Sequence, residues 1–567
     1  MHSGPLPDLD GTRIRALPSP ITAPCQENVG RLCGSPTAGW PVAEGPDRRP
    51  PSEHTVHSGP IPDLDGTGIR ARPPPITARH APGDIDRPVR AIQGVPMADR
   101  SGGSPRACRS ARLSVMLMRH MYPISRAAAL AAALFAAPLP SAVRAAGLAA
   151  TPPMGWNSWD CFGTTVTEAE VKANADYMAK FLKQHGWQYI VVDIQWSDPQ
   201  AKAHGYRPGA ELAMDGYGRL VPAPNRFPSS AGGRGFQPLA DYIHGLGLRF
   251  GIHIMRGIPR RAVQANLPVE GSKVRAAEIA DPHSTCPWND DMYGVDMRRP
   301  GAQDYYDSIL NLYAGWGVDY IKADDIARPT HGEEIAALHR AIRKTGRDIV
   351  LSLSPGPAMV KDLPRLQENA NLWRISDDFW DDWRALRLNF ILMSVWGGVG
   401  RPGAWPDADM LPLGHIGLRA ERGNDRTTRF TRDEQRTLMS LWSIFQAPLM
   451  FGGDLPGNDE FTLSLITNDE VLAVDQHGVR GHAVAEGGDS VVWAAGGAGP
   501  DEKYVAVFNV GDAKAIDVRV AWPALSMPAR CALRDLWEHK DLGTIEQGYT
   551  FRVPPHGSGL YLLRHAR

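Results

Sequence analysis

Aspartates stand at the ends of several short apolar runs in the middle of the sequence. They are Asp193, Asp324, Asp378 and Asp409. Burying one carboxylate is costly, and burying several together requires nearby cations or a ligand rich in hydroxyl groups. Cleavage of a glycosidic bond needs two opposed carboxylates, one as nucleophile or base and one as proton donor. The pattern therefore predicts a site that acts on a carbohydrate.

Cations and tryptophans lie near these carboxylates. Lys322 comes two residues before Asp324, and on a strand this spacing places both side chains on one face. Arg374 is the second available cation. His253, on another apolar run, is either a core histidine or one that faces a ligand. Indole faces stack on sugar C–H faces, and the nearby tryptophans are Trp159, Trp196 and Trp405.

Other acidic residues have a plainer interpretation. An aspartate that ends a strand often only caps the next helix, and this alternative stays open for Asp325, Asp377 and Asp381. Asp290 and Asp291 do not match the spacing of an EF-hand calcium loop. The sequence shows no cofactor motif, and we expect neither a metal nor a cofactor.

The elements that must position these residues alternate between strand and helix. From about residue 150 to 455, helical patterns such as Glu168–His185 and Gln303–Trp316 separate apolar runs. The runs are Met154–Trp159, Tyr189–Trp196, Arg249–Met255, Asp319–Ile326, Asp348–Ser354, Leu372–Asp378, Gly397–Pro406 and Ser443–Gly452. Eight such units predict an α/β fold, a (β/α)8 TIM barrel over residues 146–475. Chemistry in this fold sits at the carboxyl ends of the strands.

The sequence beyond the barrel changes in texture. Short strand-like segments, separated by Gly, Pro and Asp turns, predict a C-terminal antiparallel β-sandwich over residues 476–567. The segments are Val491–Ala495, Lys503–Val510, Ala515–Val520, Ala532–Asp535, Thr550–Val553 and Gly559–Leu563. This part has no obvious row of aromatic residues, so we expect it to cap the barrel.

The N-terminal part differs from the rest. Residues 2–23 recur at 57–78 with 18 of 22 positions identical. The repeat has much Pro and Gly and little apolar periodicity, so residues 1–115 are predicted to be a disordered extension, which need not be translated at all. Residues 116–145 carry a positive segment, the apolar run Ala127–Ala137 and small residues before Ala146. These features are typical of a signal peptide and predict export, to the periplasm or outside the cell.

Composition excludes several classes of protein. The chain has 567 residues, and 61 Lys and Arg against 62 Asp and Glu give a net charge of −1. This balance argues against a nucleic-acid binder. No apolar run approaches the ~18 residues of a membrane span. Six cysteines in this length exclude a disulfide scaffold.

Several motifs, in order and at barrel spacing, are similar to those of one enzyme family. They are Thr151-Pro-Pro-Met-Gly-Trp-Asn-Ser-Trp159, Asp319-Tyr-Ile-Lys-Ala-Asp324, Trp373-Arg-Ile-Ser-Asp-Asp378, Trp405-Pro-Asp-Ala-Asp-Met-Leu411 and Asn468-Asp-Glu-Val-Leu-Ala-Val-Asp-Gln476. The chain resembles glycoside hydrolase family 27, which contains α-galactosidases, α-N-acetylgalactosaminidases and β-L-arabinopyranosidases. The resemblance covers about residues 150–480 strongly and the C-terminal part loosely.

The resemblance implies a role for each predicted site residue. Asp324 matches the nucleophile and Asp378 the acid/base of a retaining double displacement, with Asp377 as the alternative register. Trp159 matches the aromatic wall of the sugar subsite, and His253 stands where the family often has Tyr. The matches to sugar-hydroxyl ligands are Asp193, Lys322, Arg374 and Asp409.

Besides His253, the chain departs from the family pattern at further positions. Ile194 replaces the second of two adjacent acids, which normally binds the axial 4-hydroxyl of galactose. The segment Leu351–Ser354 lacks the acid–Trp pair that meets the 2-substituent. Gln195 and Ile326 stand where many members have disulfide cysteines. Fold and reaction type therefore transfer, whereas the sugar specificity stays open.

The sequence thus predicts an exported exo-glycosidase that removes terminal α-D-galactosyl residues from galactose-containing oligo- or polysaccharides. β-L-Arabinopyranosidase and α-N-acetylgalactosaminidase activity are the alternatives within the family. A non-catalytic sugar-binding barrel and a Schiff-base aldolase using Lys322 are alternatives from other classes. Neither nucleic acid nor membrane is expected as a partner.

Overall fold

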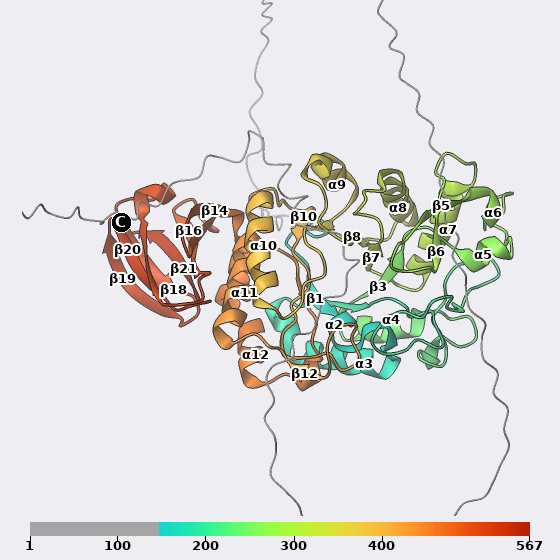
Figure 1. Cartoon of the computed structure of the whole chain (residues 1–567), viewed down its shortest axis with the longest axis horizontal. Coiled ribbons are helices and arrows are strands. Elements are labelled where there is room, and N and C mark those ends of the chain that lie inside the picture. The colour runs from blue at the N-terminus through green and yellow to red at the C-terminus, as the bar shows by residue number, and fades with distance from the viewer. Residues whose placement is uncertain (1–146, 567) are drawn as a thin grey trace, which may run out of the picture. The chain divides into compact units, whose positions relative to one another are not determined.

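The computed structural model describes residues 147–566 (Figure 1). The predicted extension (1–115) and the predicted signal peptide (116–145) lie outside the described residues. In the described part, no helix is both long and apolar enough to cross a membrane.

The centre of the fold is a parallel sheet of eight strands that closes into a barrel. The strands are β1 (Met154–Asn157), β2 (Tyr189–Val192), β3 (Arg249–Met255), β7 (Tyr320–Asp324), β8 (Val350–Leu353), β9 (Leu372–Arg374), β10 (Trp405–Asp407) and β13 (Leu449–Phe451). Their order is β10-β9-β8-β7-β3-β2-β1-β13. Leu411 closes the ring with a parallel bridge to Phe451. The predicted (β/α)8 barrel is confirmed.

Helices follow the strands and surround the sheet (Figure 1). They are α2 (Trp159–Phe162), α3 (Glu168–Tyr177), α4 (Gln237–Gly245), α5 (Arg260–Gln264), α6 (Ala276–Ile279), α7 (Ala302–Gly315), α8 (Gly332–Thr345), α9 (Leu363–Asn369), α10 (Trp383–Trp396), α11 (Arg432–Phe445), α12 (Glu460–Ile466) and α13 (Asp469–His477). A π-helical turn, Met178–Leu182, and a 3-10 turn, Lys183–His185, extend α3. Further 3-10 turns span Gly163–Thr165, Pro228–Ser230, Val360–Asp362, Leu455–Gly457 and Trp522–Leu525.

Caps fix where the helices begin. At α11, Thr431 Oγ1 accepts a hydrogen bond from the Glu434 amide (3.2 Å), and the Glu434 carboxylate accepts one from the Thr431 amide (2.8 Å). This reciprocal capping box satisfies two backbone donors at the start of the helix. Gln446 adopts a left-handed conformation (φ 68°) directly after α11. The predicted strand Ser443–Gly452 is therefore too long at its start, because Ser443–Phe445 is the last turn of this helix.

Two small antiparallel sheets lie in connections of the barrel. The first joins β4 (Ile258–Pro259), β6 (Met292–Val295) and β5 (Ala280–Thr285), and the second joins β11 (His415–Ile416) and β12 (Arg426–Thr427). Both follow carboxyl ends of barrel strands, so they belong to the face where the predicted site residues lie.

The C-terminal part is an antiparallel β-sandwich, as predicted. Its larger sheet has the order β14-β15-β16-β21-β18-β19, and β17 pairs with β20. The strands are β14 (Val479–Gly487), β15 (Ser490–Gly496), β16 (Glu502–Asn509), β17 (Ile516–Ala521), β18 (Arg530–Asp535), β19 (Lys540–Glu546), β20 (Gly548–Val553) and β21 (Ser558–His565). The sequence did not indicate β14 and β19, since much of each faces solvent.

Candidate active site

The carboxyl ends of neighbouring barrel strands bring the predicted site residues together. β3 pairs with β7 in a register that sets His253 beside Lys322 and Met255 beside Asp324. Asp193 follows β2, the other neighbour of β3. Because the strands are parallel, their last residues meet at one end of the barrel.

Lys322 and Asp193 form a buried ion pair at this end. The Lys322 ammonium donates to Asp193 Oδ2 at 2.9 Å, and the Asn157 amide donates to the same oxygen at 2.7 Å. Burial alone would raise the pKa of Asp193, but the Lys322 charge, the His253 ring and these hydrogen bonds outweigh it and lower the pKa. Asp193 is therefore held as a carboxylate.

Asp324 is held by two donors. The Asp325 amide donates to Oδ1 at 2.8 Å, and Nε2 of His253 lies 3.1 Å from Oδ2. Burial acts to raise the Asp324 pKa, but His253, Lys322 and the backbone donor together lower it to about 2. Asp324 is thus an ionised carboxylate at neutral pH, oriented by these two donors.

Arg374, at the end of β9, contacts two further predicted site residues. Its guanidinium lies 2.8 Å from Asp409 Oδ1 and 3.4 Å from Asp378 Oδ1. Asp377 instead pairs with Arg328 at 2.8 Å, and its side chain is 57% exposed. Of the two adjacent aspartates, Asp378 is therefore the one beside the buried cation.

Burial opposes ionisation at two other acids near the site. It raises the pKa of Asp409 to about 7, against the lowering effect of Arg374. It also raises the pKa of Asp160 well above its usual range, with a further contribution from Asp409. Asp160 Oδ2 is buried without a hydrogen-bond partner, and it packs so closely on Gly452 that a side chain there would not fit.

A row of aromatic rings continues outward from Trp159. The Trp159 and Tyr206 rings are stacked, with centroids 5.8 Å apart and an interplanar angle of 19°. Tyr206 in turn contacts Trp288 at 5.4 Å. Trp196 and Trp405 do not join this row. The Trp196 indole donates to the His253 carbonyl and its ring packs on Phe236, while Trp405 donates to the Ala149 carbonyl.

Ile194 is buried in apolar surroundings at the end of β2. It belongs to a cluster that includes Met255, Met292 and Trp159. With His253 and both methionines it lines a small cavity of about 20 Å³. Position 194 itself therefore has no carboxylate, although Asp291 and Gln195 line the same cavity.

The acids with a plainer interpretation have structural partners. Asp325 pairs with the buried Arg256 at 2.8 Å. Asp381 pairs with Arg426 at 2.6 Å. Asp291 accepts a hydrogen bond of 2.7 Å from Gln195, one of the two positions where many family members have a disulfide cysteine. Ile326, the other such position, is fully buried. The described cysteines, Cys161, Cys286 and Cys531, are buried and free.

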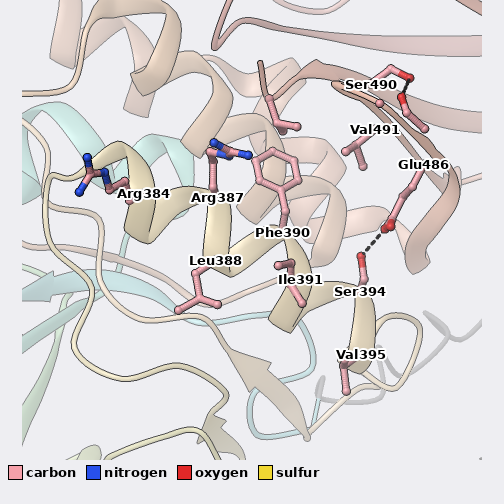
Figure 2. A pocket seen from close by; sticks show the side chains of 13 residues that line it. Arg384, Arg387, Leu388, Phe390, Ile391, Ser394, Val395, Glu486, Ser490 and Val491 are labelled. Atoms are coloured by element: carbon pink, nitrogen blue, oxygen red, sulfur yellow. Dashed lines mark hydrogen bonds between the residues drawn. The ribbon is translucent and has the colours of Figure 1, made fainter. Parts of the chain in front are cut away.

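A larger cavity lies away from these residues, between α10 and the β14–β15 hairpin (Figure 2). Its volume is about 690 Å³. Leu388, Ile391 and Val395 line it from α10, and Glu486 on the hairpin accepts a hydrogen bond from Ser394. It has neither paired carboxylates nor an exposed aromatic face, so it lacks the groups for sugar cleavage. Over residues 147–566, no cluster of three His, Cys, Asp or Glu side chains is arranged for a metal ion.

The structure adds residues that the sequence did not single out. Asn157 and Asp160 flank the Ser158-Trp159 pair; Asn157 binds Asp193, and the pKa of Asp160 responds to the charges of Asp409 and Lys322. Their position next to Trp159, the predicted aromatic wall, is the sequence feature that could have indicated them. Tyr206 and Trp288 come from long connections without periodicity, and no local pattern indicates them.

Two family models match the chain. The model described as alpha galactosidase A matches residues 289–477, and the model described as the alpha galactosidase C-terminal beta sandwich domain matches residues 487–563. Alpha-galactosidase 2 of Arabidopsis thaliana is 30% identical over 431 residues, which cover 74% of this chain and 90% of that relative.

Two bacterial structures are more similar in sequence. A family 27 β-L-arabinopyranosidase from Geobacillus stearothermophilus is 55% identical, with a TM-score of 0.73, over 74% of this chain and 97% of its own. A candidate α-N-acetylgalactosaminidase from Bacillus halodurans is 50% identical, with a TM-score of 0.67, over 73% and 97%. The chain therefore belongs to glycoside hydrolase family 27, the α-galactosidase-like glycoside hydrolases.

Proposed function

We propose that this enzyme is a retaining exo-glycosidase that removes terminal β-L-arabinopyranosyl residues. The observation that carries the reaction type is the environment of Asp324. This carboxylate is ionised and is held by His253 and the Asp325 amide. At the same end of the barrel, Asp378 contacts the Arg374 guanidinium. A fixed, ionised carboxylate is what nucleophilic attack on an anomeric carbon requires.

The proposed reaction has two displacements. Asp324 attacks the anomeric carbon while Asp378 gives its proton to the leaving oxygen, and the sugar stays covalently bound to Asp324. Asp378 then takes a proton from water, and the resulting hydroxide releases the sugar. Asp378 suits both steps because its side chain is 38% exposed and therefore open to water.

The remaining polar residues bind the terminal sugar. Asp193 and Lys322 present a carboxylate and an ammonium, and Arg374 and Asp409 present a second such pair. Each pair offers both acceptors and donors to ring hydroxyls. Charge-assisted hydrogen bonds of this kind are about twice as strong as neutral ones.

Ile194 supports arabinopyranose as the terminal sugar. β-L-Arabinopyranose is α-D-galactopyranose without its hydroxymethyl group, so it brings one hydroxyl fewer to the site. In this proposal the extra hydroxymethyl group of galactose lies against Ile194, Met255 and Met292, and position 194 provides no carboxylate for its hydroxyl. A buried hydroxyl that lacks such a partner costs about 1–3 kcal/mol. The 55% identity to the Geobacillus β-L-arabinopyranosidase supports the same choice.

α-Galactosidase activity is the second candidate. It is the specificity that the motifs first suggested, and the Arabidopsis relative is named for it. The ring hydroxyls are the same in both sugars, so the Asp193–Lys322 and Arg374–Asp409 pairs accept either one. Because the 4-hydroxyl is common to both sugars, the two proposals differ in whether the wall at Ile194 accommodates the additional hydroxymethyl group of galactose.

Initial rates on 4-nitrophenyl β-L-arabinopyranoside, α-D-galactopyranoside and α-N-acetylgalactosaminide test the proposal. We expect the highest kcat/KM on the arabinoside and loss of release in Asp324→Ala. In Ile194→Asp, the ratio of galactoside to arabinoside activity should rise roughly ten- to a hundredfold, as a charge-assisted hydrogen bond predicts. A folded wild-type enzyme that prefers the galactoside would favour the second candidate, and release from none would refute both.

We also infer that the enzyme is exported, because residues 116–145 have the pattern of a signal peptide. N-terminal sequencing of the protein purified from a bacterial periplasm tests this inference. A mature chain that starts near Ala146 is the expected result, whereas an intact segment 116–145 in cytosolic protein would contradict it.

A further inference from the structure

We propose that Tyr206 and Trp288 form an aromatic platform that binds the leaving group of the substrate, a second pyranose unit next to the scissile bond. This inference rests on the proposed glycosidase function and deepens it. It assigns a binding site on the side of the catalytic carboxylates away from the terminal sugar.

The first observation is the spacing of the rings. A carbon–carbon contact spans roughly 3.5–4.0 Å, so a pyranose held between two aromatic faces needs about twice that distance. The Trp159 and Tyr206 centroids are only 5.8 Å apart, at 19°. No sugar fits between them, so a sugar that contacts Tyr206 must lie outside the space between these two rings.

The second observation is the change of exposure along the row. Trp159 is 6% exposed, whereas Tyr206 and Trp288 are half-buried. The contact between Tyr206 and Trp288, at 5.4 Å and 42°, carries the surface outward. Partly open aromatic rings that continue from a sugar wall are suited to stack a further sugar.

The third observation is that Tyr206 lies near both catalytic carboxylates. Burial raises the pKa of the Tyr206 phenol well above its usual range, and the charges of Asp324 and Asp378 raise it further. The phenol is therefore within electrostatic reach of the bond-breaking pair.

The loop that carries Tyr206 is anchored on both sides of the ring. Arg207 pairs with the buried Asp198 at 2.8 Å. Nδ1 of His204 lies 2.7 Å from the Ala420 carbonyl, and the Gly209 amide donates to Asp290 at 3.1 Å. A platform fixed in this way stacks a sugar without first having to be ordered, which lowers the entropic cost of binding.

Glycosyl fluorides separate this platform from the terminal-sugar subsite. Fluoride is a good leaving group and occupies almost no space beyond the scissile bond, so its release does not use the platform. We compare kcat/KM for a glycosyl fluoride and for a disaccharide with the same terminal sugar. In Trp288→Ala the ratio of disaccharide to fluoride activity should fall about tenfold, the effect of one lost stacking interaction.

Three variants complete the test. Tyr206→Ala should lower the same ratio at least as far, and Tyr206→Phe, which keeps the ring, should stay near wild type. Tyr217→Ala is the matched control, because Tyr217 lies on the same connection but is 40% exposed and contacts Arg219 instead. It should change neither the ratio nor the rates.

The outcomes separate this inference from the function on which it rests. If Trp288→Ala and Tyr206→Ala lower both activities equally, or neither, the platform is refuted while the glycosidase stands. If the folded wild-type enzyme hydrolyses no glycosyl fluoride, the proposed function fails and the platform with it.

Discussion

His253 is the residue whose chemistry most directly controls the proposed nucleophile. It lies on β3, paired in register with Lys322 of β7, and its Nε2 is 3.1 Å from Asp324 Oδ2. Asp193, directly after β2, also has its pKa lowered by His253. Among the groups that lower the Asp324 pKa, His253 acts both through its hydrogen bond and through its charge. The structure thus places His253 against the proposed nucleophile.

Replacing His253 should shift the acid limb of the pH–rate profile. His253→Phe keeps a ring but removes the donor, so the pKa of Asp324 should rise from about 2. A protonated Asp324 cannot attack, and kcat/KM should therefore begin to fall at a higher pH than in the wild type. His253→Gln, which keeps an N–H donor, should shift less. An unchanged acid limb in His253→Phe would exclude this role.

The sequence was informative for residues on strands and much less so for residues on loops. Lys322 and Asp324 share a face because side chains alternate along a strand, so the strand pattern alone predicts that they lie together. Asp377 and Asp378 lie beyond the end of β9, where no periodicity distinguishes them. Only their tertiary contacts, Asp377 with Arg328 and Asp378 with Arg374, show which of the two lies beside the buried cation. Tyr206 was not predictable, since its loop is held by distant residues.

At the scale of elements, helix boundaries depended on single residues that composition does not reveal. The predicted helix Glu168–His185 is α3 followed by a π-helical turn and a 3-10 turn. The strand predicted at Ser443–Gly452 is shortened to Leu449–Phe451 by the end of α11. Existence and order of the barrel strands were predictable because buried parallel strands are almost continuously apolar.

Helix α13 carries a buried acid with an incomplete set of partners. Asp475 is fully buried, and its Oδ2 accepts a hydrogen bond of 2.6 Å from the Gln476 side chain. Oδ1 has no partner. Burial therefore raises the pKa of Asp475 well above its usual range. The folded protein binds a proton here that the unfolded chain releases above about pH 4.

Asp475→Asn should stabilise the enzyme at neutral pH. Because the folded-state pKa is raised, the stability contributed by the protonated carboxyl is complete below about pH 4 and is lost as pH rises toward the folded-state pKa. Asn removes this loss, so the free energy of unfolding at pH 7 should increase by about 1 kcal/mol or more. Denaturant melts at pH 4 and pH 7 measure it. A gain that does not grow with pH would contradict the assignment.

At the scale of the whole molecule, the barrel and the sandwich share hydrophobic packing. One core cluster contains Phe445 of α11 together with Trp493 of β15 and Phe508 of β16. Hydrogen bonds cross the same boundary, such as the 2.7 Å bond from Thr437 to the His556 carbonyl. Separate sequence patterns predicted both parts, but their shared core follows from tertiary contacts that no local pattern encodes.

The shared core predicts one cooperative unfolding transition for the described part of the chain. Trp493 is fully buried, and its ring meets Phe445 edge-on at 6.0 Å, so Trp493→Ala should cost about 3–5 kcal/mol. Thermal loss of enzyme activity and thermal loss of the β-sheet signal should then shift together to a lower temperature. Two domains that unfolded independently would instead show two separate transitions. Val479→Ala on β14 is the control, since Val479 is 53% exposed and its loss should change stability by less than about 0.5 kcal/mol. Calorimetry showing two separated transitions, with activity lost only in the second after Trp493→Ala, would mean that the sandwich folds on its own and only decorates the barrel.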